Sequence, residues 1–362
     1  MCYPKTMAQA SGTPRPTQED FAARYHAILC ADVPAFLGRY ASLPLMRRLG
    51  GVGLLCGTDW TPLFNNRFFY SRLDHSIGTA LITWRFTHDK VQTIAALLHD
   101  VATPAFSHVV DFKNHDAMTQ SSTERLAPSL IARDDALLAL LVRDGIAPAA
   151  VSYPERYPVV DNAIPRLSAD RLEYMYPTAA ALSSLWSIDE IERNFAAVKV
   201  LTSEEGAVEL GFGDVDEASR YTVRFAHVGL MLQQGEDKLA MQLLADVLEE
   251  AERVGLLTEG DLYAESEERL IAHFTLFAHE HPTCRFASLF RTFRGTRCIV
   301  RGDTPPEGYY CVSVKTKLRY VDPLVETPQG IKRTSAVSPA AQHAIEELLR
   351  FEDSPFACAR WL

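Results

Sequence analysis

The sequence lacks several features that would assign it to a particular class of protein. Its seven cysteines are odd in number and form no Cys-x-x-Cys pair, which argues against a disulfide framework or a zinc knuckle and favours a reducing compartment. No apolar run approaches the roughly 18 residues of a membrane-spanning helix. The N-terminal residues contain no apolar core of a secretory signal. We therefore expect a cytoplasmic protein that does not enter a membrane.

The chain also lacks an excess of basic residues. Its formal net charge is −10, from 36 Lys and Arg against 46 Asp and Glu. Broad binding to duplex DNA requires a basic surface, so the charge argues against it. A small anionic substrate is still compatible with this charge, because a bound cation and a few Lys or Arg side chains reverse the field locally.

Helical periodicity dominates the residues that are present. The chain has 362 residues, 47% of them hydrophobic and 23% charged, which is the composition of an ordinary globular protein. Acidic and apolar residues alternate at helical spacing over residues 216–254, which predicts one or two long amphipathic helices. We predict a mainly α fold, with a helical core and a small β element late in the sequence.

Four segments follow from the pattern along the chain. Residues 1–16 are rich in Pro, Gly and Ser and are predicted to form a mobile tail. Residues 17–200 are predicted to form the helical core, 201–293 a helical extension, and 294–362 a small β hairpin with a C-terminal helix. Periodicity and end signals predict these helices: from residue 17, 33–49, 74–86, 90–100, 119–133, 135–143, from 168 to 176, 265–279 and 339–351. An irregular loop is expected over residues 53–70.

The predicted hairpin pairs residues 296–301 with residues 309–320, which both alternate with period 2. Its second strand carries Lys315, Lys317 and Arg319 on one face. This face is either a contact for an anion or an allosteric nucleotide, or the solvated side of an edge strand that charge protects from pairing. The sequence leaves both interpretations open.

One apolar helix ends in two adjacent ionisable residues, His99 and Asp100. A buried charge is costly unless it is paired, neutralised or bound to a metal. Taken alone, such a pair is more often a satisfied histidine beside a surface aspartate. The interpretation as a metal site gains weight here because His75 lies at the start of an earlier predicted helix and Asp170 in the first turn of a later one.

Two imidazoles and two carboxylates suit a divalent ion such as Fe, Mn, Mg or Zn, with positions left for water and substrate. Such an ion polarises a phosphoryl oxygen and lowers the pKa of bound water from about 16 toward about 7. That is the chemistry of phosphoester hydrolysis.

The order of these residues resembles the HD-domain superfamily of metal-dependent phosphohydrolases, in particular its deoxynucleoside triphosphate triphosphohydrolase branch. The resemblance covers residues 33–176 and implies an HD-domain helical core. It rests on residues 45–51, on Arg72, His75 and Gly78, on His99 and Asp100, on Phe106, His108, Asp111 and His115, and on Asp170 and Tyr174.

The resemblance implies roles for individual residues. The metal ligands fall on His75, His99, Asp100 and Asp170. The catalytic positions near the phosphates fall on His108, Asp111 and His115. An imidazole with a pKa near 6.5 suits proton transfer at neutral pH, and we expect His115 to protonate the leaving-group oxygen. By itself, His115 would more often be a surface histidine beside Asp116.

The substrate positions fall on Arg72, Arg48 and Tyr174. Arg72 is expected to contact a phosphate as a fixed cation, and Tyr174 to line the pocket. Arg48 replaces a glutamine that reads the sugar in the resembled branch, and a guanidinium only donates hydrogen bonds. Thr103 replaces a histidine of that branch and cannot carry its proton. The substrate is therefore not expected to copy that of the branch.

These residues predict a hydrolase that uses a divalent metal and acts on a phosphoester or phosphoanhydride of a nucleotide or related small phosphate compound. Two alternatives are a di-iron oxygenase of the HD fold, with His108 and His115 as extra ligands, and a nucleotide sensor that has lost turnover through Thr103. The resemblance also implies a homo-oligomer, for which the acidic helices of residues 216–254 offer a surface.

Overall fold

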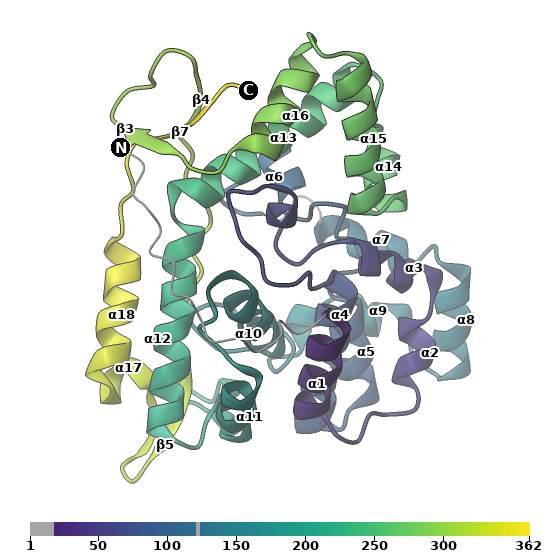
Figure 1. Cartoon of the computed structure of the whole chain (residues 1–362). Coiled ribbons are helices and arrows are strands. Elements are labelled where there is room, and N and C mark those ends of the chain that lie inside the picture. The colour runs from purple at the N-terminus through teal and green to yellow at the C-terminus, as the bar shows by residue number, and fades with distance from the viewer. Residues whose placement is uncertain (1–17, 121–123) are drawn as a thin grey trace.

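The computed structural model of the protein describes residues 18–120 and 124–362. The predicted tail at residues 1–16 lies outside the described residues. Helices make up most of the described chain (Figure 1). They enclose two large hydrophobic clusters, one built mainly from the first 230 residues and the other mainly from residues 239–310 together with residues 105–117. No helix among the described residues is both long enough and apolar enough to cross a membrane.

The first cluster is organised around α4 (Arg72–Thr87), which packs against α5 (Lys90–Leu98), α10 (Ala169–Ser183) and α1 (Gln18–Leu29). Polar caps fix where these helices begin. Ser71 and Asp74 form a capping box at the start of α4, and Ser168 caps α10 as the sequence predicts.

Prolines explain why two predicted helices are shorter than expected. Residues 33–49 form α2 (Leu37–Ala41), α3 (Pro44–Arg47) and η1 (Arg48–Gly51) rather than one helix. Leu43 is extended, with φ −60° and ψ 142°, because a residue before proline avoids the helical region. In residues 119–133 the described part contains η3 (Glu124–Leu126) and α7 (Ala127–Ile131), with Pro128 at the start of α7.

Other elements of the first half agree more closely with the sequence. Residues 53–70 contain only η2 (Thr58–Trp60) and are otherwise irregular. The predicted helix at residues 135–143 is α8 (Asp135–Arg143). The remaining elements of this half are α6 (Val109–Lys113), α9 (Pro148–Val151), η4 (Pro154–Arg156) and α11 (Ile188–Ala196).

The acidic segment at residues 216–254 forms two helices, α12 (Val215–Leu232) and α13 (Gly235–Arg253). This confirms the prediction of long amphipathic helices. The apolar face of α13 joins the second hydrophobic cluster. It packs there with the short helices that follow, α14 (Glu259–Ala264), α15 (Glu267–Glu280) and α16 (Arg285–Gly295).

The β structure is larger than predicted. β1 (Val198–Thr202) and β2 (Val208–Phe212) form strands where a helical extension was expected from residue 201. They join β5 (Leu324–Thr327) and β6 (Gly330–Arg333) in a four-stranded sheet of order β1-β2-β5-β6. β2 and β5 are parallel, so this sheet depends on a pairing between distant segments.

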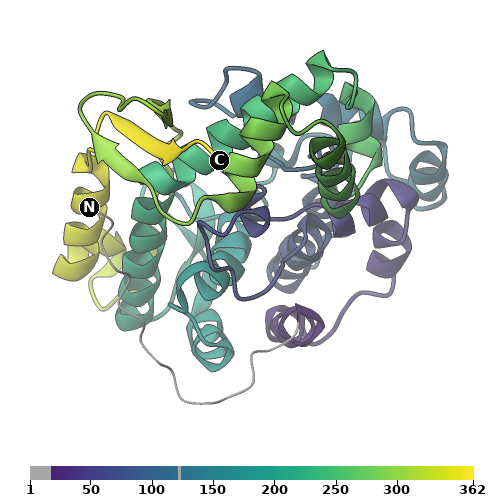
Figure 2. The same cartoon turned by 45° about the horizontal axis from the view of Figure 1, so that its top comes forward.

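The predicted late hairpin is wrong. β3 (Val300–Gly302) and β4 (Tyr309–Val312) do not pair with each other, because β7 (Phe356–Arg360) lies between them and pairs with both (Figure 2). The strand expected over residues 309–320 ends at Val312, and residues 313–323 are irregular. The last helices, α17 (Thr334–Val337) and α18 (Pro339–Arg350), precede β7.

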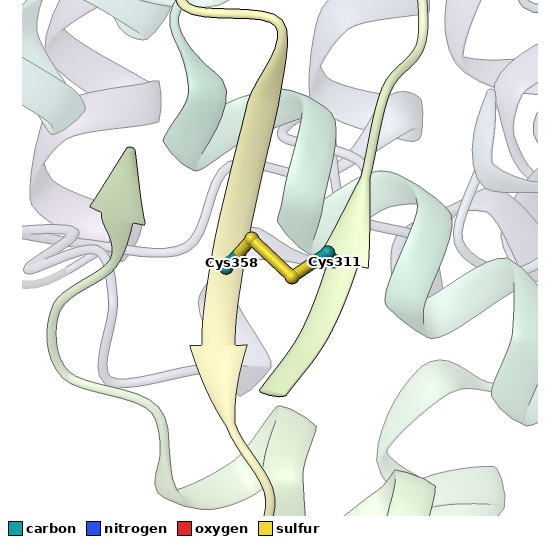
Figure 3. Close-up of a disulfide and its surroundings, with 2 residues drawn as sticks. All are labelled: Cys311 and Cys358. Atoms are coloured by element: carbon teal, nitrogen blue, oxygen red, sulfur yellow. A yellow bond between two sulfur atoms is a disulfide. The ribbon is translucent and has the colours of Figure 1, made fainter. Parts of the chain in front are cut away.

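Cys311 and Cys358 form a disulfide across β4 and β7 (Figure 3). The two residues are direct partners in the antiparallel register, with their Cα atoms 4.1 Å apart. The sequence argued against a disulfide framework, and it did not predict this single bond. An odd number of cysteines and the lack of a Cys-x-x-Cys pair exclude a dense framework but leave room for one bond between distant strands.

Candidate metal centre

Three helices bring three ligand-type atoms to one point. His75 lies on α4, His99 follows the last residue of α5, and Asp170 lies in the first turn of α10. The two Nε2 atoms of the histidines are 3.1 Å apart. Oδ1 of Asp170 lies 3.2 Å from Nε2 of His75 and 3.5 Å from Nε2 of His99. Among the described residues, these three form the one group with the donors and spacing to hold a metal ion.

These distances fit a divalent ion. Two ligand atoms that each lie about 2.0–2.2 Å from one ion are themselves about 3.0–3.5 Å apart. Two imidazole nitrogens that face each other with their lone pairs repel unless a cation or proton lies between them. The geometry and the donor set therefore both suit a metal.

Both histidines are oriented through their other ring nitrogen. Nδ1 of His75 hydrogen-bonds to the carboxylate of Glu173. Nδ1 of His99 donates to the carbonyl oxygen of Ala96, at 2.7 Å. Both Nε2 atoms point toward Asp170. With a proton held on each Nδ1, each Nε2 can give up its own proton and ligate an ion, as in many metal sites where a second partner fixes the ligand ring.

Glu173 is a residue of the candidate site that sequence reasoning missed. Its side chain is fully buried and also accepts a hydrogen bond from the Tyr70 hydroxyl, at 2.7 Å. It follows Asp170 by three residues, so both side chains lie on one face of α10. That spacing inside a buried helix was the available signal. Gly78 of α4 faces this carboxylate, and a Cβ there would stand 2.8 Å from Cδ of Glu173.

The cluster holds an excess of negative charge. Burial disfavours protonation of His75, but Glu173 and Asp170 outweigh it and raise the pKa of His75 to about 10. Burial opposes ionisation of Asp170, but hydrogen bonds from His75 and His99 hold its pKa well below the usual value. A site that binds a proton this strongly at an imidazole also attracts a metal cation.

Asp100 stands further from the other three predicted ligands. Its Oδ2 atom lies 3.7 Å from Nε2 of both histidines. The same oxygen accepts a hydrogen bond from Nη1 of Arg72 at 2.8 Å, and Oδ1 accepts one from the Thr103 hydroxyl at 3.1 Å. Despite burial, Arg72 and the histidines keep the pKa of Asp100 well below its usual range.

Two of the predicted substrate residues are engaged with the protein itself. Arg72 is buried, and it also donates from Nε to the Ser107 hydroxyl at 3.1 Å. Arg48 donates from Nη1 to the carbonyl oxygen of Thr103 at 2.8 Å and from Nη2 to that of Val101. Arg48 therefore holds the turn that follows Asp100, which a glutamine would reach with fewer donors.

The remaining predicted residues differ in how deeply they are buried. Nδ1 of His108 pairs with Oδ2 of the buried Asp111 at 3.0 Å. Burial and the charges of Arg319 and Arg72 lower the pKa of His108, although Asp111 opposes this. The Tyr174 ring centroid lies 6.3 Å from that of His75. His115 is exposed, with φ 58°, and its ring forms no hydrogen bond or ion pair within the described part of the chain.

A buried carboxylate from the second half of the chain fixes two loops beside the cluster. Oε1 of Glu267, at the start of α15, accepts hydrogen bonds from the backbone N–H groups of Gly53 and Phe106, both at 2.9 Å. Its Oε2 atom accepts one from the Trp60 indole at 2.7 Å. Burial raises the pKa of Glu267 to about 7. These loops lead directly to Arg72 and to Ser107.

Comparisons with known proteins give two partial relatives in sequence. No family model matches the chain. It is 26% identical over 140 residues to the metal-dependent phosphohydrolase cns2 of Cordyceps militaris, which is 39% of this chain and 40% of that protein. It is 31% identical over 115 residues to the uncharacterized protein YdhJ of Bacillus subtilis, which is 31% of this chain and 34% of that protein. The chain thus matches well under half the length of these curated relatives.

Two solved structures share the fold over nearly the whole chain. A phosphohydrolase from Bacteroides thetaiotaomicron superposes with a TM-score of 0.63 and 13% identity, covering 91% of this chain and 97% of that one. A hypothetical protein from Aquifex aeolicus superposes with a TM-score of 0.60 and 13% identity, covering 91% of this chain and 93% of that one. At this identity the likeness concerns the fold. The relative named as a metal-dependent phosphohydrolase and the His75, His99 and Asp170 cluster are both consistent with the resemblance to the HD-domain phosphohydrolases.

Proposed function

We propose that the protein hydrolyses a phosphoester or phosphoanhydride bond of a nucleotide or related small phosphate compound, using a divalent metal. The observation that carries the proposal is the convergence of Nε2 of His75, Nε2 of His99 and Oδ1 of Asp170 within 3.5 Å of one another. The name of the Cordyceps militaris relative supports the same chemistry.

The residues of the chain have distinct tasks in this proposal. His75, His99 and Asp170 would hold the ion, with Asp100 beside them, and the ion would polarise a phosphoryl oxygen and acidify a bound water. Glu173 and the Ala96 carbonyl keep the two rings in the tautomer that ligates. Arg72 balances the charge of Asp100 and keeps its carboxylate near both histidines.

His108 is the side chain best placed to move a proton. Its Nδ1 hydrogen-bonds to Asp111, and its pKa is lowered by burial, so the ring is neutral near pH 7 with Nε2 able to accept a proton. His115 as the general acid stays a prediction, and its exposed ring has no contact with the cluster that fixes it there.

A nucleotide is the proposed substrate because of the likeness to the triphosphohydrolase branch. The two residues that depart from that branch, Thr103 and Arg48, both form hydrogen bonds within this chain. Thr103 hydrogen-bonds to Asp100, and Arg48 holds the turn between them. The structure thus offers a reason for both residues within the protein, and neither needs to read the substrate.

The proposal is tested by metal analysis of the purified protein followed by a panel of nucleotides and simple phosphate esters. Release of phosphate, pyrophosphate and triphosphate is measured separately. We expect bound divalent metal and hydrolysis that disappears in His99→Ala and Asp170→Ala. A protein that binds no divalent metal, or variants that hydrolyse at the wild-type rate, would contradict it. Oxygen consumption with two irons per chain would instead favour the oxygenase.

A further inference from the structure

The irregular segment between β4 and β5, residues 313–323, is anchored to two other parts of the chain. The backbone N–H of Lys317 donates to the carbonyl oxygen of Ala117 at 3.1 Å. The side chain of Gln233, at the end of α12, donates to the carbonyl oxygen of Lys317 at 3.1 Å and accepts from the Thr316 hydroxyl at 3.3 Å. This segment therefore joins the loop after α6 to the end of α12.

Arg319 follows these anchors and lies near two of the predicted site residues, His108 and Tyr174. Its guanidinium donates to Oε1 of Gln120, a buried side chain four residues beyond Asp116. Burial lowers the pKa of His108, and the charge of Arg319 lowers it further. Burial raises the pKa of Tyr174 to about 12, and Arg319 opposes that shift. Arg319 is thus close to two predicted site residues from different parts of the chain, His108 after α5 and Tyr174 on α10.

Arg319 differs from the other arginines around the cluster in having donors to spare. Arg72 is paired with Asp100, Arg48 with two backbone carbonyls, and Arg171 with Asp161 and Asn162. Among the residues that the structure describes, no carboxylate lies within 4.0 Å of the Arg319 guanidinium. A guanidinium has five N–H donors, so its bond to Gln120 leaves most of them available.

Several acidic groups share this neighbourhood. Asp111 pairs with His108, and Asp170 and Asp161 act on the pKa of Tyr174 together with Arg319. Asp237 of α13 is close enough for Arg319 to affect its pKa, but burial prevails and raises that pKa to about 7. Near neutral pH a large share of Asp237 is therefore uncharged. Its average negative charge is therefore smaller than that of an ordinary aspartate at this pH, and within the described part of the chain it forms no ion pair with Arg319.

We propose that Arg319 binds a phosphate group of the substrate, and that Gln120 is the residue that positions it. Guanidinium groups bind phosphate through two parallel hydrogen bonds, which favours a phosphate at this place over an uncharged group. The inference rests on the proposed function in one respect: it assumes that the metal centre acts on a phosphorylated compound. In this proposal the phosphate of the substrate contacts Arg319, in a late segment of the chain, and not Arg72.

The test measures binding of inorganic pyrophosphate to the metal-loaded protein by calorimetry, in parallel with hydrolysis kinetics on the most active compound of the panel. Arg319→Gln should weaken pyrophosphate binding by about 10-fold or more, the range for hydrogen bonds to charged groups. Its metal content should be unchanged, and KM should rise more than kcat falls. Arg319→Lys should recover part of the binding, because it restores the charge without the forked geometry.

Lys315→Gln is the matched control, since it removes one positive charge from an exposed position of the same segment. It should bind pyrophosphate as the wild type does. Gln120→Ala should weaken binding by a smaller factor and gives the answer if Arg319→Gln does not fold. Unchanged binding in Arg319→Gln and Gln120→Ala, or no pyrophosphate binding by the wild type, would overturn the proposal. Arg319-dependent binding without hydrolysis of any compound would overturn the hydrolase and keep the anion site.

Discussion

Gly78 on α4 lies directly against the carboxylate of Glu173 on α10. A Cβ at position 78 would stand 2.8 Å from both Cγ and Cδ of Glu173, a distance that real Cβ contacts do not reach. The close approach of these two helices lets Glu173 hydrogen-bond to Nδ1 of His75. The glycine thus serves the metal centre although it carries no functional group.

Gly78→Ala should therefore damage the metal centre. The added methyl displaces a fully buried carboxylate, at a cost of about 1–3 kcal/mol in the free energy of unfolding, as for other overpacked sites. We expect metal affinity to fall together with stability, measured by calorimetric metal titration and by denaturant unfolding. Gly38→Ala is the control, because its Cβ meets nothing within 4 Å. Equal metal affinity in the two variants would refute the role of Gly78.

Glu173→Gln should weaken metal binding without removing a ligand. The amide keeps the size of the side chain but loses the negative charge that favours a proton on Nδ1 of His75. Loss of such a partner typically costs 10–100-fold in metal affinity. Glu209→Gln is the matched control, since Glu209 is equally buried but pairs with Arg333 in the β1-β2-β5-β6 sheet. Metal affinity should fall in the first variant and stay unchanged in the second.

The stability of the protein should decrease as pH rises toward neutrality because of Glu267. Its pKa rises from an ordinary 4.5 to about 7 on folding, so the folded state holds the proton more tightly. The contribution is fully present below about pH 4.5 and is lost as pH rises through 7, by at most about 3 kcal/mol. Glu267→Gln should flatten the curve of unfolding free energy between pH 5 and 8.

Glu268→Gln provides the comparison for that curve, because it changes an exposed carboxylate next in sequence. It should follow the wild-type pH dependence. If the free energy of unfolding of Glu267→Gln varies with pH as that of the wild type does, the raised pKa of Glu267 does not contribute to stability between pH 5 and 8.

The bond between Cys311 and Cys358 should be recovered as a linked peptide in a proteolytic digest made without reductant. Reduction, or replacement of both residues by serine, should lower the free energy of unfolding by about 2–4 kcal/mol. The cysteines are 47 residues apart in sequence, so the bond closes a long loop. Cys284→Ser should have little effect, since serine keeps the cap that Cys284 gives to Ala287. Detection of Cys311 and Cys358 as separate alkylated thiols would contradict the pairing.

The parts of the site that could be predicted from the sequence are those set by local order. His75, His99 and Asp170 each lie at or near a helix end, and cap signals such as Ser168 locate those ends. Glu173 was within reach of the same reasoning, through its spacing from Asp170. Its partner on another helix could not be inferred, because contacts between α4 and α10 depend on packing.

The late β structure could not be predicted for a different reason. Strands β3 and β4 look like a hairpin because they are neighbours in sequence, but β7 lies 44 residues beyond β4 and takes the position between them. The period-2 pattern also continues past Val312, where Lys317 bonds instead to Ala117. Arg319 therefore lies in the segment that the pattern indicated, but the backbone there is irregular and not the expected strand.

The hydrogen bonds of Glu267 bear on the order in which the chain is made. Every predicted metal ligand has been synthesised by residue 170, yet the loops that lead to Arg72 and Ser107 have their carboxylate partner only at residue 267. Nearly a hundred further residues are therefore synthesised before the two loops gain the hydrogen bonds of Glu267. A metal ion that reaches the ligands during translation would find the two loops without the hydrogen bonds of Glu267. We therefore expect selective metal binding only in the completed chain.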